Sequence, residues 1–317
     1  MITQEELAEL SAIVGAPVVA AERCGWGFEN HTTIVTVADG RRLVVQRIAS
    51  RALASHKLQL ASALPGRLAA VGIRAPRQLA ADADADPPYA VREYLPGEAG
   101  ATHMGTIAGA TQIARAMGAL IPHLAAVATT GLALETSWAS PITLAEQSRR
   151  RIARCRTLLD APIVAALEAT IADLPARFAG RPAVFAHGDF CPVNVLIGAA
   201  GDLRLEASDM PQVSSLQSPA PLIVGLLDLE FARIADPLFD AAWWGWVVRY
   251  HHAERWVAAW PQLLAAAGFV PDAATTARVQ ALQRLRCLEM ADYHAHERTP
   301  EAAAMWVERL GVTVGWD

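Results

Sequence analysis

Residues 183–197 have the sequence AVFAHGDFCPVNVLI, in which two apolar segments flank a short polar loop. The apolar segments have the length and composition of buried strands. A loop between two such strands can direct the side chains of Asp189 and Asn194 into one cleft. A later apolar segment, VGLLDLE at residues 224–230, carries Asp228 near its end. We therefore expect three oxygen-bearing side chains to meet at the ends of strands.

The chemistry of these three side chains fits the transfer of a phosphoryl group. An aspartate can orient a hydroxyl group and accept its proton, and carboxylate and amide oxygens are ligands that Mg²⁺ prefers. The pattern predicts Asp189 as the catalytic base and Asn194 and Asp228 as the metal ligands. Glu230 is a candidate to support these ligands or to bind a second metal ion.

Three motifs together carry a family resemblance. They are H-G-D-x-x-x-x-N at residues 187–194, D-x-E at residues 228–230 and D-P-x-x-D at residues 236–240. This set resembles the aminoglycoside phosphotransferase and choline kinase family, which shares the protein kinase fold. The resemblance implies that His187 supports the catalytic loop and that Asp240 binds backbone amides of the same loop.

The resemblance also implies the fold class and the cofactors. It predicts an α+β, two-lobed protein-kinase-like fold, with a small antiparallel β N-lobe and a mainly α C-lobe. Residues 1–96 would form the nucleotide-binding lobe, and residues 97–317 the helical catalytic and substrate lobe. ATP would donate the phosphoryl group, and Mg²⁺ would bind at the predicted ligands.

A glycine-containing hairpin is predicted near the N-terminus. The segment CGWGFENH at residues 24–31 precedes an alternating apolar strand, a tight turn and a second strand over residues 43–48. In the resembled family a hairpin of this kind lies over the ATP phosphates, which assigns Gly25 and Gly27 to nucleotide binding.

The second strand carries Gln46-Arg47 where the family usually has a lysine. A cation is needed to offset the triphosphate charge, so we favour Arg47 as the nucleotide contact. Side chains alternate along a strand, and if Gln46 faces the cleft, Arg47 points away. The next helix, over residues 52–71, has no glutamate to pair with that cation, and Gln59 is the nearest stand-in. These departures leave open a binding protein with a decayed kinase site.

The connection between the lobes is predicted at residues 89–98, a strand broken by Pro96-Gly97. In the resembled family this connection holds adenine through backbone groups. The corresponding groups here are the carbonyl of Glu93 and the amide of Leu95. Pro96 has no amide hydrogen and cannot serve as the donor.

The composition argues against several classes of partner. The net charge is −5, and no basic run of the kind that follows a nucleic acid backbone is present. The four cysteines lack metal-ligand spacing, and the N-terminus has no signal-peptide pattern, so a cytoplasmic protein is expected. Residues 116–134 carry no charge, but Pro122, His123 and many small residues predict a buried helix rather than a membrane span.

Acidic residues suggest the class of substrate. The family places acidic side chains from residues 201–240 and from the last helices on substrate amines. In the last helices the acidic residues are Glu289, Asp292, Glu297 and Glu301. We expect a small hydroxyl-bearing cation such as an aminoglycoside-like antibiotic, which phosphorylation would inactivate. An amino sugar, sugar or amino alcohol is the metabolic alternative, and an acidic surface that only maintains solubility is the simpler explanation.

Two further patterns concern the surroundings of the site. Four aromatic residues lie on one helical face and predict core packing, whereas Trp244 falls off that face and can reach the cleft. They are Phe239, Trp243, Trp246 and Tyr250. A hydrolase with His187, Asp189 and Asp228 as metal ligands would need a further ligand, and the sequence offers none at suitable spacing. The insertion at residues 203–222 has no assigned role.

Overall fold

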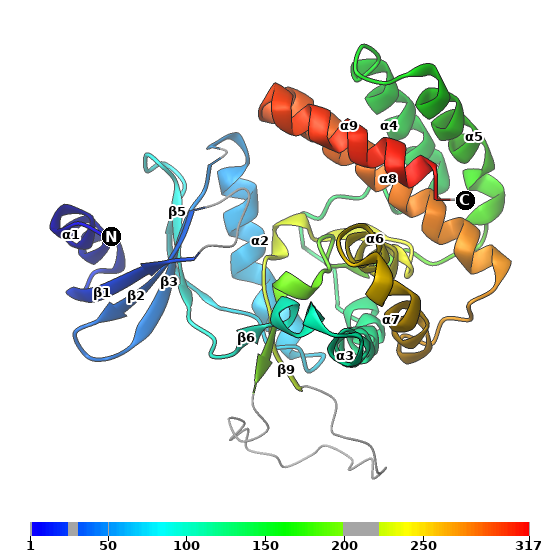
Figure 1. Cartoon of the computed structure of the whole chain (residues 1–317). Helices are drawn as coiled ribbons and strands as arrows, with labels where there is room; N and C mark the ends of the chain where they lie inside the picture. Colours follow the sequence, from blue (N-terminus) through cyan, green and yellow to red (C-terminus); the bar gives the residue numbers. More distant parts are fainter. Residues whose placement is uncertain (1, 25–30, 50, 199–221, 317) are drawn as a thin grey trace, which may run out of the picture.

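The computed structural model describes residues 2–24, 31–49, 51–198 and 222–316 and has two lobes (Figure 1). The N-terminal lobe contains an antiparallel sheet with the strand order β1-β2-β3-β5-β4. Its strands are β1 (Val18–Arg23), β2 (His31–Val37), β3 (Arg42–Arg47), β4 (Gln78–Asp82) and β5 (Tyr89–Glu93). Valine, isoleucine and threonine dominate β2, because branched side chains pack well on a pleated surface.

Two helices cover opposite faces of this sheet (Figure 1). On one face lies α1 (Gln4–Val14), where Leu10 packs with valines of β2, β3 and β5. On the other lies α2 (Arg51–Ala69), where Leu58 packs with Ile48 and Ala90. Since side chains alternate along a strand, each residue of β3 and β5 faces either α1 or α2.

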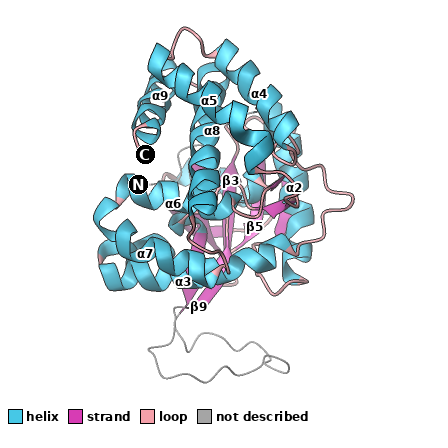
Figure 2. Ribbon diagram, turned by 90° about the vertical axis from the view of Figure 1, so that its right-hand side faces the viewer, coloured by secondary structure: helices cyan, strands magenta, loops and turns pink. Residues whose placement is uncertain are grey.

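The C-terminal lobe is mainly helical. Figures 1 and 2 show α4, α5, α8 and α9 together at one end of this lobe, and α3 with α7 at the other. The helices are α3 (Ile107–Ala125), α4 (Pro141–Arg154), α5 (Ala161–Arg177), α6 (Phe239–His251), α7 (Ala253–Ala266), α8 (Ala273–Glu297) and α9 (Pro300–Val314). Their apolar faces form two cores, one around α5, α8 and α9 and one around α3 and α7.

Side chains at helix N-termini explain where several of these helices begin. In each case an oxygen accepts a hydrogen bond from a backbone amide of the first turn, which would otherwise lack a partner. The capping residues are Thr106, Ser140, Asp160, Asp272 and Thr299. Residues 116–125 of the uncharged segment form the second half of α3 and residues 126–134 follow it, with Met117 and Leu124 buried in the core. No helix of the described residues is both long and apolar enough to cross a membrane.

Short strands at the junction of the lobes position the loops predicted to be catalytic. A three-stranded sheet joins β6 (Glu98–Ala99), β8 (Val195–Gly198) and β9 (Leu222–Leu226), and β7 (Val184–Ala186) pairs with β10 (Arg233–Ala235). The loop with Asp189 lies between β7 and β8, and Asp228 follows β9. The chain leaves the N-terminal sheet at the end of β5. We propose that the boundary between the lobes lies between residues 96 and 97.

Candidate active site

The catalytic loop brings Asp189 and Asn194 into direct contact. The amide nitrogen Nδ2 of Asn194 donates hydrogen bonds to the carboxylate oxygen Oδ2 and to the carbonyl oxygen of Asp189, each at 2.8 Å. A turn of 3₁₀-helix at Pro192–Asn194 makes this contact possible. The backbone amide of Leu227 donates to the Asn194 carbonyl at 2.8 Å, which brings Asp228 beside the loop. The structure therefore brings together all three of the oxygen-bearing residues.

Asp228 is held in a conformation that few residues adopt. Its φ is 59° and its ψ 67°, in the left-handed region, where a residue other than glycine costs about 1–3 kcal/mol. Burial raises the pKa of Asp228 well above its ordinary value, and the nearby carboxylates of Glu230 and Asp189 raise it further. Such crowding of carboxylates is unfavourable unless a cation offsets it.

The donor set around Asp228 fits Mg²⁺. Asp228 offers carboxylate oxygens, Asn194 offers its side-chain carbonyl oxygen, and a magnesium ion bound by one or two protein groups commonly completes its shell with phosphate oxygens and water. In the described part of the chain, no group of three or more His, Cys, Asp or Glu side chains could hold a metal ion.

His187 and Asp240 support the catalytic loop, as the resemblance implied. The amide of Asp189 donates to Nδ1 of the buried His187 at 3.2 Å, so Nε2 carries the ring proton and donates to the Leu227 carbonyl at 2.7 Å. The carboxylate of Asp240 accepts from the amides of His187 and Gly188 at 2.8 and 3.0 Å. Burial raises the pKa of Asp240, whereas these amides favour its ionised form.

Gly188 lies where the catalytic loop crosses the loop after Asp228. Its φ is 87°, and an added Cβ atom would lie 1.8 Å from the carbonyl oxygen of Phe231. The backbone of Phe231 would have to move to admit any side chain. The motif therefore requires glycine between His187 and Asp189.

Trp243 is a functional candidate that the sequence analysis assigned only to the core. Its indole nitrogen donates a hydrogen bond to Oδ1 of Asp189 at 2.7 Å, while its ring stacks on Trp246 with centroids 4.9 Å apart. Trp244 was expected to reach the cleft, but it is fully buried in the core. The helical spacing could have indicated this contact. Trp243 lies one turn after Asp240, and Asp240 was already expected to bind the catalytic loop.

The expected orientation of Arg47 is corrected by the strand register. Arg47 lies opposite Tyr89 on the face covered by α1, and its Nη2 atom forms an ion pair with Oε1 of Glu9 at 2.6 Å. Gln46 lies opposite Ala90 on the α2 face. Arg47 therefore points away from the side of the sheet that Gln46 faces.

A buried ion pair is present at this site, with the lysine on the helix where an acidic residue was expected and the glutamate on the loop after Asp228. Nζ of Lys57, from α2, lies 3.0 Å from Oε2 of Glu230, and each side chain is only 5% exposed. Gln59, the expected stand-in, is exposed on the same helix. The pair thus joins α2 to the loop after Asp228. The sequence pattern did not indicate Lys57, because the resembled family has the cation on the strand and the acid on the helix.

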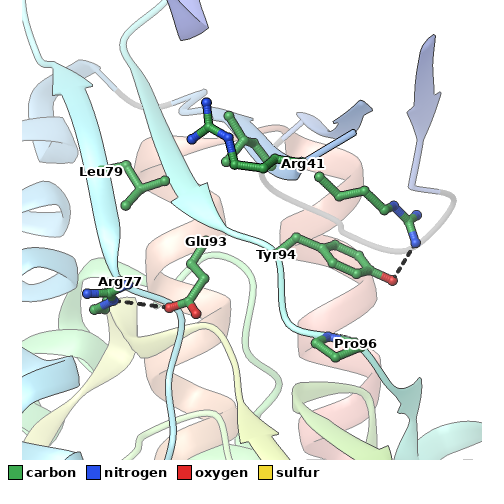
Figure 3. A pocket seen from close by; sticks show the side chains of 8 residues that line it. Arg41, Arg77, Leu79, Glu93, Tyr94 and Pro96 are labelled. Atoms are coloured by element: carbon green, nitrogen blue, oxygen red, sulfur yellow. Dashed lines mark hydrogen bonds and ion pairs between the residues drawn. The ribbon is translucent and has the colours of Figure 1, made fainter. Parts of the chain in front are cut away.

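A hollow of about 440 Å³ lies at the ends of β3 and β5, away from the catalytic loop (Figure 3). Figure 3 shows Arg77 pairing with the Glu93 carboxylate, and Nη1 of Arg42 donates to the Tyr94 hydroxyl at 2.8 Å. None of the three catalytic-loop and metal candidates lines it. The roles predicted for the backbone groups of Glu93 and Leu95 remain predictions.

Two of the acidic residues expected to meet substrate amines already have partners. Burial would raise the pKa of Glu289, but three arginines hold it well below its usual range. They are Arg151, Arg233 and Arg286. Asp292 pairs with Arg154 and lies 3.4 Å from His296. Glu297 and Glu301 are exposed, whereas Gly25, Gly27 and nearly all of the insertion lie outside the described residues.

The chain is similar to one known protein family and to several solved structures. The profile described as the phosphotransferase enzyme family matches residues 20–207. APH(2")-IIIa in complex with GDP and kanamycin is 16% identical, with a TM-score of 0.72 over 98% of this chain and 99% of that one. The apoenzyme of macrolide 2'-phosphotransferase MphH from Brachybacterium faecium is 17% identical, with a TM-score of 0.62 over 96% and 98%.

An apo form of a thermostable mutant of aminoglycoside phosphotransferase APH(4)-Ia is 14% identical, with a TM-score of 0.67 over 98% of each chain. A comparison with curated proteins finds no match. The solved structures extend over nearly the whole length of the chain. They confirm the predicted fold class, a small antiparallel β lobe followed by a mainly helical lobe.

Proposed function

Because the chain belongs to the phosphotransferase enzyme family, we propose that it transfers the γ-phosphate of ATP to a hydroxyl group of a small molecule. The contact network that joins Asp189, Asn194 and Asp228 carries this proposal. It combines a proton acceptor with oxygen ligands for Mg²⁺ at the junction of the two lobes, as phosphoryl transfer requires.

Asp189 would act as the base. Trp243 holds Oδ1 and Asn194 holds Oδ2, so the carboxylate plane is fixed before a substrate arrives. As the substrate oxygen bonds to the γ-phosphorus, its proton passes to Asp189 and the bond to the bridging oxygen of ADP breaks. Positioning and charge neutralisation would supply most of the rate.

Asp228 and Asn194 would hold Mg²⁺, which neutralises phosphate charge when bound. The buried Lys57–Glu230 pair would keep the loop after Asp228 against α2. For the nucleotide, we propose that Gly25 and Gly27 lie over the phosphates, and that the carbonyl of Glu93 and the amide of Leu95 bind adenine. We propose a cytoplasmic location, where ATP is available.

The substrate would be a small cation with a free hydroxyl group. Exposed Glu297 and Glu301 support this assignment, since both lie at the junction of α8 and α9 and can meet amines. An aminoglycoside-like antibiotic fits best, with resistance by inactivation as the consequence. A metabolic amino sugar, sugar or amino alcohol is the second candidate. No role for nucleic acid or membrane is proposed.

A screen for ATP consumption tests the proposal. It would compare aminoglycosides, macrolides, peptide antibiotics, hexosamines and choline, each with the wild type and with Asp189→Ala. We expect one substrate class to stimulate ATP consumption by the wild type only. Stimulation of both proteins would refute the role of Asp189, and failure of wild-type protein to bind Mg·ATP would favour a decayed site.

A further inference from the structure

Arg92 is a charged residue of the N-terminal sheet with no role in the mechanism proposed above. It lies on β5 opposite Val44 of β3, two positions from the Gln46–Ala90 pair. Residues opposite each other in an antiparallel pair share a face, so Arg92 faces the side covered by α2. Arg47, three residues along β3 from Val44, faces the other side and pairs with Glu9.

The guanidinium of Arg92 has no partner in the described part of the protein. It makes no hydrogen bond or ion pair there, and its Nε atom is sealed from solvent without an acceptor. A buried donor left without an acceptor is unfavourable, and this is more so for a charged group. Phosphate oxygens of a bound ligand would supply the acceptor that this cationic donor lacks.

The charges around Arg92 locate that anion. Burial lowers the pKa of Arg92, while the carboxylates of Asp228 and Glu230 are close enough to raise it. Among the described residues, neither carboxylate forms an ion pair or hydrogen bond with the guanidinium. Glu230 is already paired with Lys57. An anion bound to the Arg92 guanidinium would therefore lie on the side of the predicted metal ligand Asp228.

We propose that Arg92 binds the phosphate chain of the nucleotide, in the role that the sequence suggested for Arg47. The inference rests on the proposed kinase function. A guanidinium presents its donors in a planar fork that matches two phosphate oxygens, and it stays charged when partly buried. The cation thus reaches the phosphates from β5, while the arginine of β3 secures α1.

Calorimetric titration tests the proposal with two matched variants, Arg92→Gln and Arg47→Gln. The two arginines lie on neighbouring strands of one sheet and on opposite faces. We expect Arg92→Gln to weaken Mg·ATP and Mg·ADP binding by about 10- to 100-fold, the effect of losing a charge-assisted hydrogen bond. Adenosine has no phosphate, so its affinity should not change. Arg47→Gln should leave all three affinities within about twofold, as expected for a partly exposed pair.

Wild-type affinity of Arg92→Gln for Mg·ATP would overturn the inference, and so would an equal loss for adenosine, which would assign Arg92 to the base. If Arg92→Gln does not fold, Arg92→Lys replaces it, with a smaller loss for the nucleotides expected and unchanged Mg·ATP binding as the refuting result. Wild-type protein that binds no Mg·ATP would instead refute the proposed function itself.

Discussion

The indole nitrogen of Trp243 lies 2.7 Å from carboxylate oxygen Oδ1 of Asp189. One turn earlier on α6, Asp240 accepts hydrogen bonds from the amides of His187 and Gly188. A single helix therefore fixes both the backbone of the catalytic loop and the side chain that would accept the proton. Stacking on Trp246 in turn holds Trp243 in place.

Replacing Trp243 by phenylalanine should lower kcat by about 10- to 100-fold, because the change removes a hydrogen bond to a charged group. KM for ATP should stay constant, since the ring does not contact the expected nucleotide groups. The control is Trp246→Phe on the same helix, α6. This change removes a hydrogen bond of equal length, from Nε1 of Trp246 to Oγ1 of Thr313 on α9. Equal kcat losses in the two variants would show that Trp243 acts only through packing.

The Lys57–Glu230 pair should matter more for stability than any surface pair. Lys57→Met leaves the Glu230 carboxylate buried without this partner, and we expect unfolding to become easier by about 3–5 kcal/mol. Urea denaturation of Lys57→Met, Glu230→Leu and the double variant measures the coupling between them. The double variant should recover part of the loss. Strictly additive losses would mean that the two groups do not interact.

Glu289 should make stability sensitive to acid. Its folded-state pKa lies well below the ordinary value of 4.5, so its contribution is present above pH 4.5 and is lost as the pH falls through the folded-state pKa. The difference in unfolding free energy between wild type and Glu289→Gln should therefore be largest near pH 7 and should shrink below pH 4.5. A difference that is constant from pH 7 to pH 3 would contradict the ion-pair assignment.

Removal of the Asp228 carboxylate should separate nucleotide binding from Mg²⁺. In wild type we expect Mg²⁺ to strengthen ATP binding, and in Asp228→Ala this gain should disappear, because Asn194 alone supplies one neutral oxygen ligand. Equilibrium titrations with Mg²⁺ and with EDTA measure the gain. If Asp228→Ala keeps the full effect of Mg²⁺, the metal binds elsewhere.

The sequence was sufficient to predict the parts of the site that local motifs determine. The spacing of Asp189 and Asn194 predicted a turn that lets the side chains meet, and apolar strands before Asp189 and Asp228 predicted where they lie. The resemblance added the support given by Asp240. These relationships depend on short segments and on motif order, which a sequence displays directly.

Contacts between distant elements could not be predicted in the same way. Alternation along β3 shows that Gln46 and Arg47 face opposite sides, but only the packing of α1 determines which side each faces. The pairing of Lys57 with Glu230 joins α2 to a loop far along the chain. Helical spacing placed Trp243 in the core, and it gave no information on the direction of the indole nitrogen.

The most direct test of the phosphotransferase assignment compares wild type with Asp189→Asn, using the substrate found by the ATP-consumption screen. The transfer of labelled γ-phosphate to that substrate gives kcat, and calorimetry gives the affinity for Mg·ATP. We predict that kcat falls by about two to four orders of magnitude, the usual contribution of a general base, with the affinity almost unchanged. Unchanged transfer by Asp189→Asn would contradict the assignment.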